Sequence, residues 1–172
     1  TSSIVCSNGT TGNINGGSVV FYNVSYTKTA GTVASITGSN TFNNLSIAGR
    51  TSAGIAQVSF NADQTINGTL TLSAGTNAAM RTFVRSDTIG TTRTLTCAAV
   101  ASLTDIDFRD ITIAGAAAPV SGTRLGDCKG NSGITFPSPK TVYYVLSISA
   151  NWGPGSGGSG PWLNSSSGTP DA

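Results

Sequence analysis

A six-residue phrase occurs three times in this chain and constrains its fold more than any other feature. It runs Phe, two polar or aromatic residues, an apolar residue, Ser or Thr, and a final apolar residue, at residues 21–26, 42–47 and 108–113. Such a motif, recurring in a background of Thr, Ser, Asn and Gly, is typical of a coil whose turns stack. We therefore predict that the phenylalanines occupy equivalent interior positions beside a second apolar stack: Phe21, Phe42 and Phe108, with Val24, Leu45 and Ile111.

Apolar residues at the centres of the expected strands return at intervals of 21, 25, 25 and 16 residues. These residues are Val24, Leu45, Leu70, Leu95 and Ile111. Around them apolar and hydroxyl side chains alternate, which places one face of each strand against a core and the other in solvent. Loops of variable length between similar strands explain the unequal intervals.

The fold class that this pattern favours is all-β, a parallel β-helix or β-solenoid of stacked short strands. The alternative is an antiparallel β-sandwich or jelly roll. The dipeptide Asn67–Gly68 would close a two-residue hairpin in the alternative fold, or form a corner between two strands of one coil in a solenoid. Asn23 and Asn44 hold matching positions of the repeated phrase, which favours structural roles for them.

The composition supports strands and turns and removes several kinds of chemistry. Only 9% of the 172 residues are charged, 22 are Gly, and Glu and His are absent. Thr, Ser, Asn and Gly oppose helix formation and suit strands and tight turns. Without His, the chain by itself has no Ser/His/Asp or Cys/His catalytic set and no His-based metal site. We expect no cofactor, no metal and no enzymatic activity.

The charge pattern argues against two classes of partner. The net charge is +2 and the Arg residues are scattered, so no basic stripe points to nucleic acid or to an anionic membrane. No apolar run approaches the roughly 20 residues that a membrane helix needs.

The three cysteines, Cys6, Cys97 and Cys128, cannot all pair within one chain. Their wide spacing lacks the clustering of a zinc site. The favoured interpretation is that they are buried small residues, and the alternative is one Cys97–Cys128 disulfide.

A change of composition predicts a boundary near residue 150. Residues 1–149 form the solenoid-like domain, and residues 150–172 form a Gly/Ser/Pro-rich segment that leads to a further module outside this sequence. Trp152 and Trp162 predict that this segment is anchored to a surface, with at least one indole substantially buried. The first and last residues indicate a piece of a longer protein.

The richest acidic cluster contains Asp105, Asp107 and Arg109. In a strand these three side chains share one face, with Ile106 and Phe108 on the other. Two adjacent carboxylates could bind calcium or cleave a glycosidic bond as an acid/base pair. We favour a solvated outer face on which Arg109 keeps both acids ionised, because the cluster lacks the spacing of a loop-type calcium motif.

A Gly-rich segment, residues 121–133, carries Arg124, Asp127 and Lys129. Its backbone amides could bind a phosphate or carboxylate, but its spacing matches no phosphate-binding loop, so a structural loop is favoured. Polar loops on a rigid wall also suit sugars. The candidate ligand-binding residues of the whole chain are Asp105, Asp107, Arg109, Arg124, Asp127, Lys129, Trp152 and Trp162.

Residues 40–172 resemble a module of large repetitive surface proteins, as in bacteriophage tail appendages and bacterial adhesin-like proteins. The resemblance lies in residues 107–115, 121–136, 140–145, 151–152 and 167–170. It implies a parallel β-helix-like body, exposure outside the cell, and homotrimeric assembly where the module belongs to a phage fibre.

These observations predict a noncatalytic structural or receptor-binding segment of a phage virion appendage, of the tail-fibre or tailspike type. The alternatives are a bacterial extracellular adhesin or surface-filament subunit and, third, a polysaccharide-cleaving β-helix enzyme. The expected location is extracellular or on a virion surface. The expected partners are other copies of the chain, adjacent modules of the same assembly and a host-surface glycan.

Overall fold

The structure, a computed structural model, divides into two compact units, Thr1–Pro137 and Ser138–Ala172. It describes residues 3–7, 12–27, 33–52, 56–138, 143–144 and 162–163. In the second unit, β16 (Tyr143–Tyr144) pairs antiparallel with β17 (Trp162–Leu163). Trp152 and the side chain of Trp162 lie outside the described residues, so the predicted boundary near residue 150 and the anchoring role of the indoles stay predictions.

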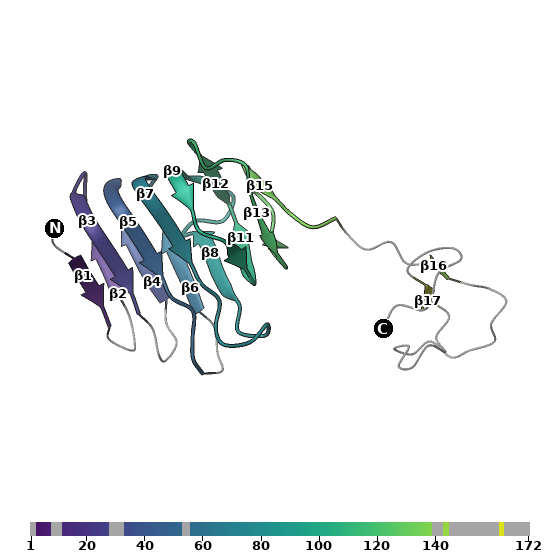
Figure 1. Cartoon of the computed structure of the whole chain (residues 1–172). Coiled ribbons are helices and arrows are strands. Elements are labelled where there is room, and N and C mark those ends of the chain that lie inside the picture. The colour runs from purple at the N-terminus through teal and green to yellow at the C-terminus, as the bar shows by residue number, and fades with distance from the viewer. Residues whose placement is uncertain are drawn as a thin grey trace. The chain divides into compact units, whose positions relative to one another are not determined.

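The first unit contains two six-stranded sheets (Figure 1). Sheet A consists, in spatial order, of β1 (Ser3–Cys6), β3 (Val20–Tyr26), β5 (Asn40–Ile47), β7 (Gln64–Leu72), β9 (Arg93–Val100) and β12 (Ile111–Ala114). Sheet B consists of β14 (Gly126–Asp127), β11 (Ile106–Arg109), β8 (Thr82–Ser86), β6 (Ala56–Phe60), β4 (Val33–Thr37) and β2 (Gly12–Asn15). A smaller sheet contains β10 (Leu103–Thr104), β13 (Val120–Thr123) and β15 (Ile134–Thr135).

Strand pairing within these three sheets is parallel throughout the described residues. From β1 to β9 the chain alternates between sheet A and sheet B, and from β10 onward it also passes through the small sheet, so each strand pairs with its equivalent in the next turn. The described part of the chain contains no helix. The predicted fold class is therefore confirmed: the chain is a parallel β-solenoid of about 5 turns, and the antiparallel alternative is wrong.

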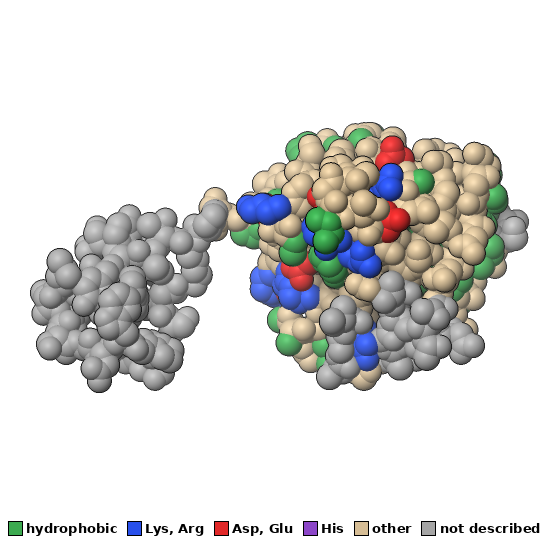
Figure 2. All heavy atoms as spheres, turned by 180° about the vertical axis from the view of Figure 1, so that it is seen from behind, with side chains coloured by type: hydrophobic (Ala, Val, Ile, Leu, Met, Phe, Trp, Pro, Cys, Tyr) green, Lys and Arg blue, Asp and Glu red, His purple; other side chains and the backbone are tan. Residues whose placement is uncertain are grey.

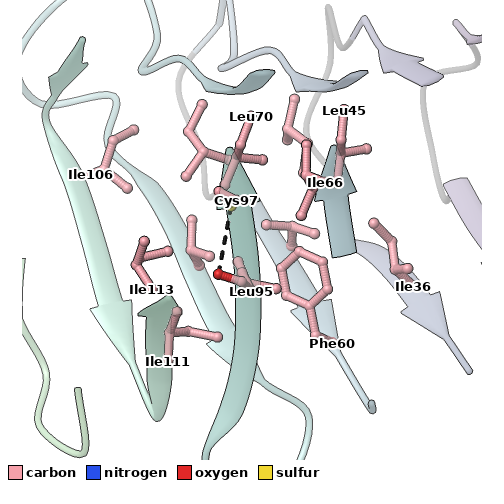
Figure 3. Packing of buried hydrophobic residues seen from close by; sticks show 14 of the residues in the cluster. Ile36, Leu45, Phe60, Ile66, Leu70, Leu95, Cys97, Ile106, Ile111 and Ile113 are labelled. Atoms are coloured by element: carbon pink, nitrogen blue, oxygen red, sulfur yellow. Dashed lines mark hydrogen bonds between the residues drawn. The ribbon is translucent and has the colours of Figure 1, made fainter. Parts of the chain in front are cut away.

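The core lies between the two sheets and consists of columns of equivalent residues. In sheet A, Val24, Leu45 and Leu70 stand in register and are all buried. In sheet B, Phe108 continues a column from Val84. Figure 3 shows Leu45, Ile66 and Leu70 of sheet A with Ile36 and Phe60 of sheet B among the packed residues. Each such side chain contributes roughly 1.5–3 kcal/mol by its burial.

The alignment of the repeated phrase is right for its first two copies and wrong for the third. Phe21 pairs with Phe42, and their rings stack with centroids 5.3 Å apart. Phe21 is only half-buried, whereas Phe42 and Phe108 are fully buried. Phe108 and Arg109 belong to β11 in sheet B, while residues 111–113 of the phrase begin β12 in sheet A. Asp110, at a φ of 54°, turns the corner inside the phrase.

The later strand markers are buried as predicted but occupy different columns. Leu95 pairs with Gln64 and Ile113, and Ile111 pairs with Arg93. The column of Leu70 continues to Val100 instead. The register between strands thus shifts along the sheet, but the same side chains still face the core. The alternation of residues along a strand determines which face of the sheet a side chain is on, and not which residue it pairs with.

Asn67–Gly68 is neither a hairpin nor a corner, because it lies inside β7 at a change of register between Ile66 and Thr69. The Thr69 amide donates a hydrogen bond to Asn44 Oδ1 (2.8 Å), and Asn44 Nδ2 donates to Asn23 Oδ1 (2.9 Å). The matching asparagines therefore pair across turns, which confirms their structural role.

We predict that Gly68→Ala destabilises the solenoid by roughly 1–3 kcal/mol through overpacking. A Cβ at Gly68 would contact the backbone oxygen of Asn43 and Oδ1 of Asn44. Gly17→Ala is the matched control, since a Cβ there meets nothing within 4 Å. Urea denaturation followed by circular dichroism measures both free energies of unfolding. Equal stability of the two variants would contradict the close approach at Gly68.

We also predict that Phe108→Ala costs about 3–5 kcal/mol, because it removes a fully buried ring and leaves a cavity. Phe83→Ala, on the outward face of the neighbouring strand β8, should cost clearly less, since Phe83 is only half-buried. The same denaturation experiment compares them. A loss below about 1 kcal/mol for Phe108→Ala would show that its ring is not interior.

Candidate functional site

Asp105 anchors an ion-pair cluster at the corner before β11. It has a φ of 57° and is only 4% exposed, so it does not share an outward strand face with Asp107 as predicted. Asp is one of the residues that tolerate this left-handed conformation, which aims its carboxylate differently from a strand residue. Arg124 donates to Asp105 through Nε and Nη2, both at 2.7 Å, and Arg81 Nη1 donates at 3.2 Å.

Asp107 lies on the outward face of β11 and is bound by Arg81. Arg81 Nε donates to Asp107 Oδ1 and Oδ2 at 2.9 and 2.8 Å, and Arg81 Nη2 donates to Oδ1 at 2.6 Å. Arg81 Nη2 also donates to the backbone oxygen of Arg124 at 2.6 Å. A side chain at Gly126 would collide with Asp107 Oδ1, so the Gly lets the neighbouring strand pass close to the ion pair.

The prediction that Arg109 is the cation paired with these two acids is wrong. Arg109 Nε faces Asp110 Oδ2 at 3.4 Å, and its guanidinium lies over the Phe83 ring, 5.5 Å from the centroid. Arg81 and Arg124 neutralise the acids instead. Arg81 precedes β8 as Asp105 precedes β11, and these residues are 24 positions apart. The 25-residue intervals in the sequence could have identified Arg81, because one turn of the coil returns to the same corner.

The electrostatics of the cluster favour an ionised Asp105. The hydrogen bonds from Arg124, followed by the charges of Arg124 and Arg81, hold the pKa of Asp105 below its ordinary value against the effect of burial. A glycoside-cleaving pair needs one carboxyl that stays protonated near its working pH. Asp105 is arranged for the opposite state, as a carboxylate held ionised between two guanidinium groups.

The Gly-rich loop after β14 fastens itself to the solenoid. Asp127 Oδ1 accepts hydrogen bonds from the Lys129 amide (2.9 Å) and Asn131 Nδ2 (2.8 Å). The hydrogen bond from Asn131 is the largest cause of the lowered pKa of Asp127. Asn131 also donates to the Phe108 backbone oxygen and accepts from the Ile111 amide. These contacts favour the structural interpretation of the loop, while the Lys129 side chain is 87% exposed.

A second candidate site is a groove of about 430 Å³ along the outer face of sheet A. Its outward column Thr41, Thr65 and Thr96 is in register across three turns. Asp63 contributes the one carboxylate of the lining and accepts a hydrogen bond from the Thr94 amide at 2.8 Å. The full lining is Ser18, Ser39, Asn40, Thr41, Asp63, Gln64, Thr65, Thr94 and Thr96.

The sequence predicted hydroxyl-rich outer faces but not this groove. Its lining comes from β5, β7 and β9, from the loops that precede β5 and β7, and from Ser18 before β3, which are separated by whole turns of the coil. Ser18, Ser39 and Asp63 are 21 and 24 residues apart, close to the first two strand intervals of 21 and 25, so the repeat length could have indicated that these three meet. The stacking of turns is what assembles the groove.

The three cysteines are free. Cys97 is buried, and burial raises its pKa to about 12, whereas Cys6 is half-buried and Cys128 is exposed. The interpretation of buried small residues thus holds for Cys97 and is wrong for Cys128, and the Cys97–Cys128 disulfide is not formed. Within the described residues, no group of three or more Cys, Asp, Glu or His side chains could hold a metal ion. No helix in that part of the chain is long and apolar enough to cross a membrane.

We predict that Asp105→Asn makes the free energy of unfolding less dependent on pH in the acid range. The folded pKa of Asp105 is lowered, so its ion pairs stabilise the fold above the unfolded pKa of about 4 and are lost as the pH falls through the folded value. Urea midpoints measured from neutral pH down to about pH 2 should therefore fall less steeply in the variant, although it is less stable at neutral pH. Identical slopes for the two proteins would refute the ion-pair assignment.

Comparison with known proteins finds no matching family model, no matching curated protein and no matching solved structure. The resemblance to surface-protein modules is therefore supported at the level of architecture alone, as a parallel β-solenoid with repeating turns. What the chain does has to be argued from its own surface.

Proposed function

We propose that this chain is a noncatalytic structural and receptor-binding segment of an extracellular appendage, of the phage tail-fibre or tailspike type. The architecture supports the structural part. Every turn is hydrogen-bonded to the next through both sheets, from β1 to β12 and from β2 to β14. Such stacking makes solenoids extended scaffolds with long binding surfaces.

The groove on sheet A is the observation that carries the receptor-binding part. Hydroxyl and amide groups dominate its lining, and Asp63 is its single charged group. Its volume of about 430 Å³ lies within the range of about 300–1,000 Å³ that is usual for small-ligand sites. Donors and acceptors on a rigid wall suit the hydroxyls of a sugar, so the proposed receptor is a host-surface glycan.

The ion-pair cluster supports a noncatalytic role. Asp105 and Asp107 are each bound by two or more guanidinium hydrogen bonds from Arg81 or Arg124. Each carboxylate thus accepts three of the roughly four hydrogen bonds that its oxygens can take, which leaves little acceptor capacity for deprotonating a water. The cluster therefore has a structural explanation that requires no turnover.

The first turns of the solenoid support assembly with an adjacent module. β1 and β2 end their sheets, and no described strand pairs with their outer edges. Exposed apolar side chains gather on β1, β3 and the residue before β3: Ile4, Val5, Val19, Val20 and Tyr22. A neighbouring coil of the same assembly, stacked on these edges, would satisfy the backbone groups and cover the apolar surface.

We predict that the purified chain binds a neutral surface glycan and that Thr65→Arg weakens this binding at least about tenfold, because the longer side chain fills the groove. Thr71→Arg is the matched control. Thr71 lies on the same strand and is likewise half-buried, but it does not line the groove. A glycan array followed by isothermal titration measures the affinities.

Two outcomes would contradict this proposal. Equal weakening by the two substitutions would show that the groove is not the binding site. Release of new reducing ends from a bound polysaccharide, abolished by Asp107→Asn, would replace the noncatalytic role by that of a polysaccharide-cleaving enzyme.

A further inference from the structure

Two arginines meet on the outer face of sheet B, on adjacent strands. Arg85 of β8 and Arg109 of β11 are register partners in a parallel pair, and both side chains are half-buried on the outward face. Like charges placed opposite one another destabilise a sheet. An arrangement of this kind is most stable when a negative charge lies between the two cations.

The protein itself does not supply Arg85 with that charge. Arg85 Nε donates to Gln57 Oε1 (3.4 Å) and its Nη1 donates to the Ser86 backbone oxygen (3.1 Å), both neutral acceptors. Among the described residues it contacts no carboxylate. In this respect it differs from four other arginines, each of which contacts an aspartate: Arg81, Arg93, Arg109 and Arg124.

The same backbone oxygen holds the second guanidinium. Arg109 Nη2 donates to the Ser86 oxygen at 3.3 Å, so both cations converge on one carbonyl group. Arg109 is further fixed by its position over the Phe83 ring. Within the described structure, Arg85 Nη2 and Arg109 Nη1 have no hydrogen-bond acceptor. Each of these half-buried guanidinium groups thus keeps one terminal nitrogen that no acceptor among the described residues contacts.

The acids near this pair are already committed. Asp107 and Asp105 are bound by Arg81 and Arg124, and Asp110 accepts a hydrogen bond from the Gly90 amide and lies 3.4 Å from Nε of Arg109 itself. Seen from behind, this side of the molecule shows Lys and Arg side chains gathered next to hydrophobic ones (Figure 2). The cation that lies beside the half-buried ring of Phe83 is the guanidinium of Arg109.

We propose that Arg85 and Arg109 bind the carboxylate of an acidic sugar, with Phe83 beneath Arg109 holding that guanidinium in place. Guanidinium groups match the two oxygens of a carboxylate. This inference rests on the proposed role in glycan binding and adds a second, charge-selective site on the opposite sheet from the hydroxyl-lined groove.

The probes for this site are an oligogalacturonate and the same oligomer with its carboxyl groups reduced to alcohols. Isothermal titration at low salt should detect binding of the acidic oligomer, and Arg85→Gln should weaken it about tenfold. Lys129→Gln is the matched control, since it removes the same charge from an exposed neighbouring loop. Arg85→Lys keeps the charge but loses the planar guanidinium whose paired N–H donors match a carboxylate. Its affinity should therefore lie between those of the wild type and Arg85→Gln.

The outcomes separate this inference from the proposed function. Arg85→Gln should leave binding of neutral glycans in the groove unchanged. The inference is overturned by equal binding of the reduced oligomer, or by equal effects of Arg85→Gln and Lys129→Gln. Circular dichroism of each variant confirms that the fold is retained. If the acidic-sugar site is overturned in either way but neutral glycans still bind, the groove proposal stands.

Discussion

In-register parallel pairing between successive turns is the constraint on which the rest of this structure depends. It sets equivalent residues of neighbouring turns side by side, which builds the apolar columns inside and the threonine column outside. Both proposed binding surfaces follow from it. The groove needs Thr41, Thr65 and Thr96 in one column, and the cationic site needs Arg85 opposite Arg109. A ligand that repeats along its length, as a polysaccharide does, suits a surface that repeats in this way.

The corners carry most of the charged chemistry, because the sheets leave little room for it. Asp105, Asp110, Arg124 and Lys129 all have positive φ and lie where the chain leaves one strand for another. The side chains of Asp105 and Asp110 bind Arg124 and the backbone of the adjacent turn instead of facing solvent along a strand, whereas the Lys129 side chain stays exposed. The aspartates therefore stabilise turns, and this accounts for a cluster that would otherwise resemble a catalytic pair.

The sequence predicted the strand faces well because facing depends on local alternation alone. Leu70, Leu95 and Ile111 are buried as their patterns indicated, even though they do not share a column. The failure at Phe108 has the same origin. Its phrase matches the earlier two in residue type, but Asp110 turns the chain from sheet B to sheet A within it. The six-residue pattern does not show that the chain turns a corner at Asp110, because that corner depends on the positive φ of this one residue.

The sequence by itself determined that this chain forms strands with an apolar interior and a hydroxyl-rich exterior, because both properties follow from residue type and alternation. It favoured parallel stacking over an antiparallel sandwich, and the strand pairing of the structure decided between them. Only the tertiary structure decided which side chains meet. Arg81 reaches Asp105 and Asp107 across 24 and 26 residues, and Ser18 joins Asp63 and Thr96 in one groove. Those meetings depend on the length of every loop between the turns, and loop length changes the register without changing the pattern of any strand.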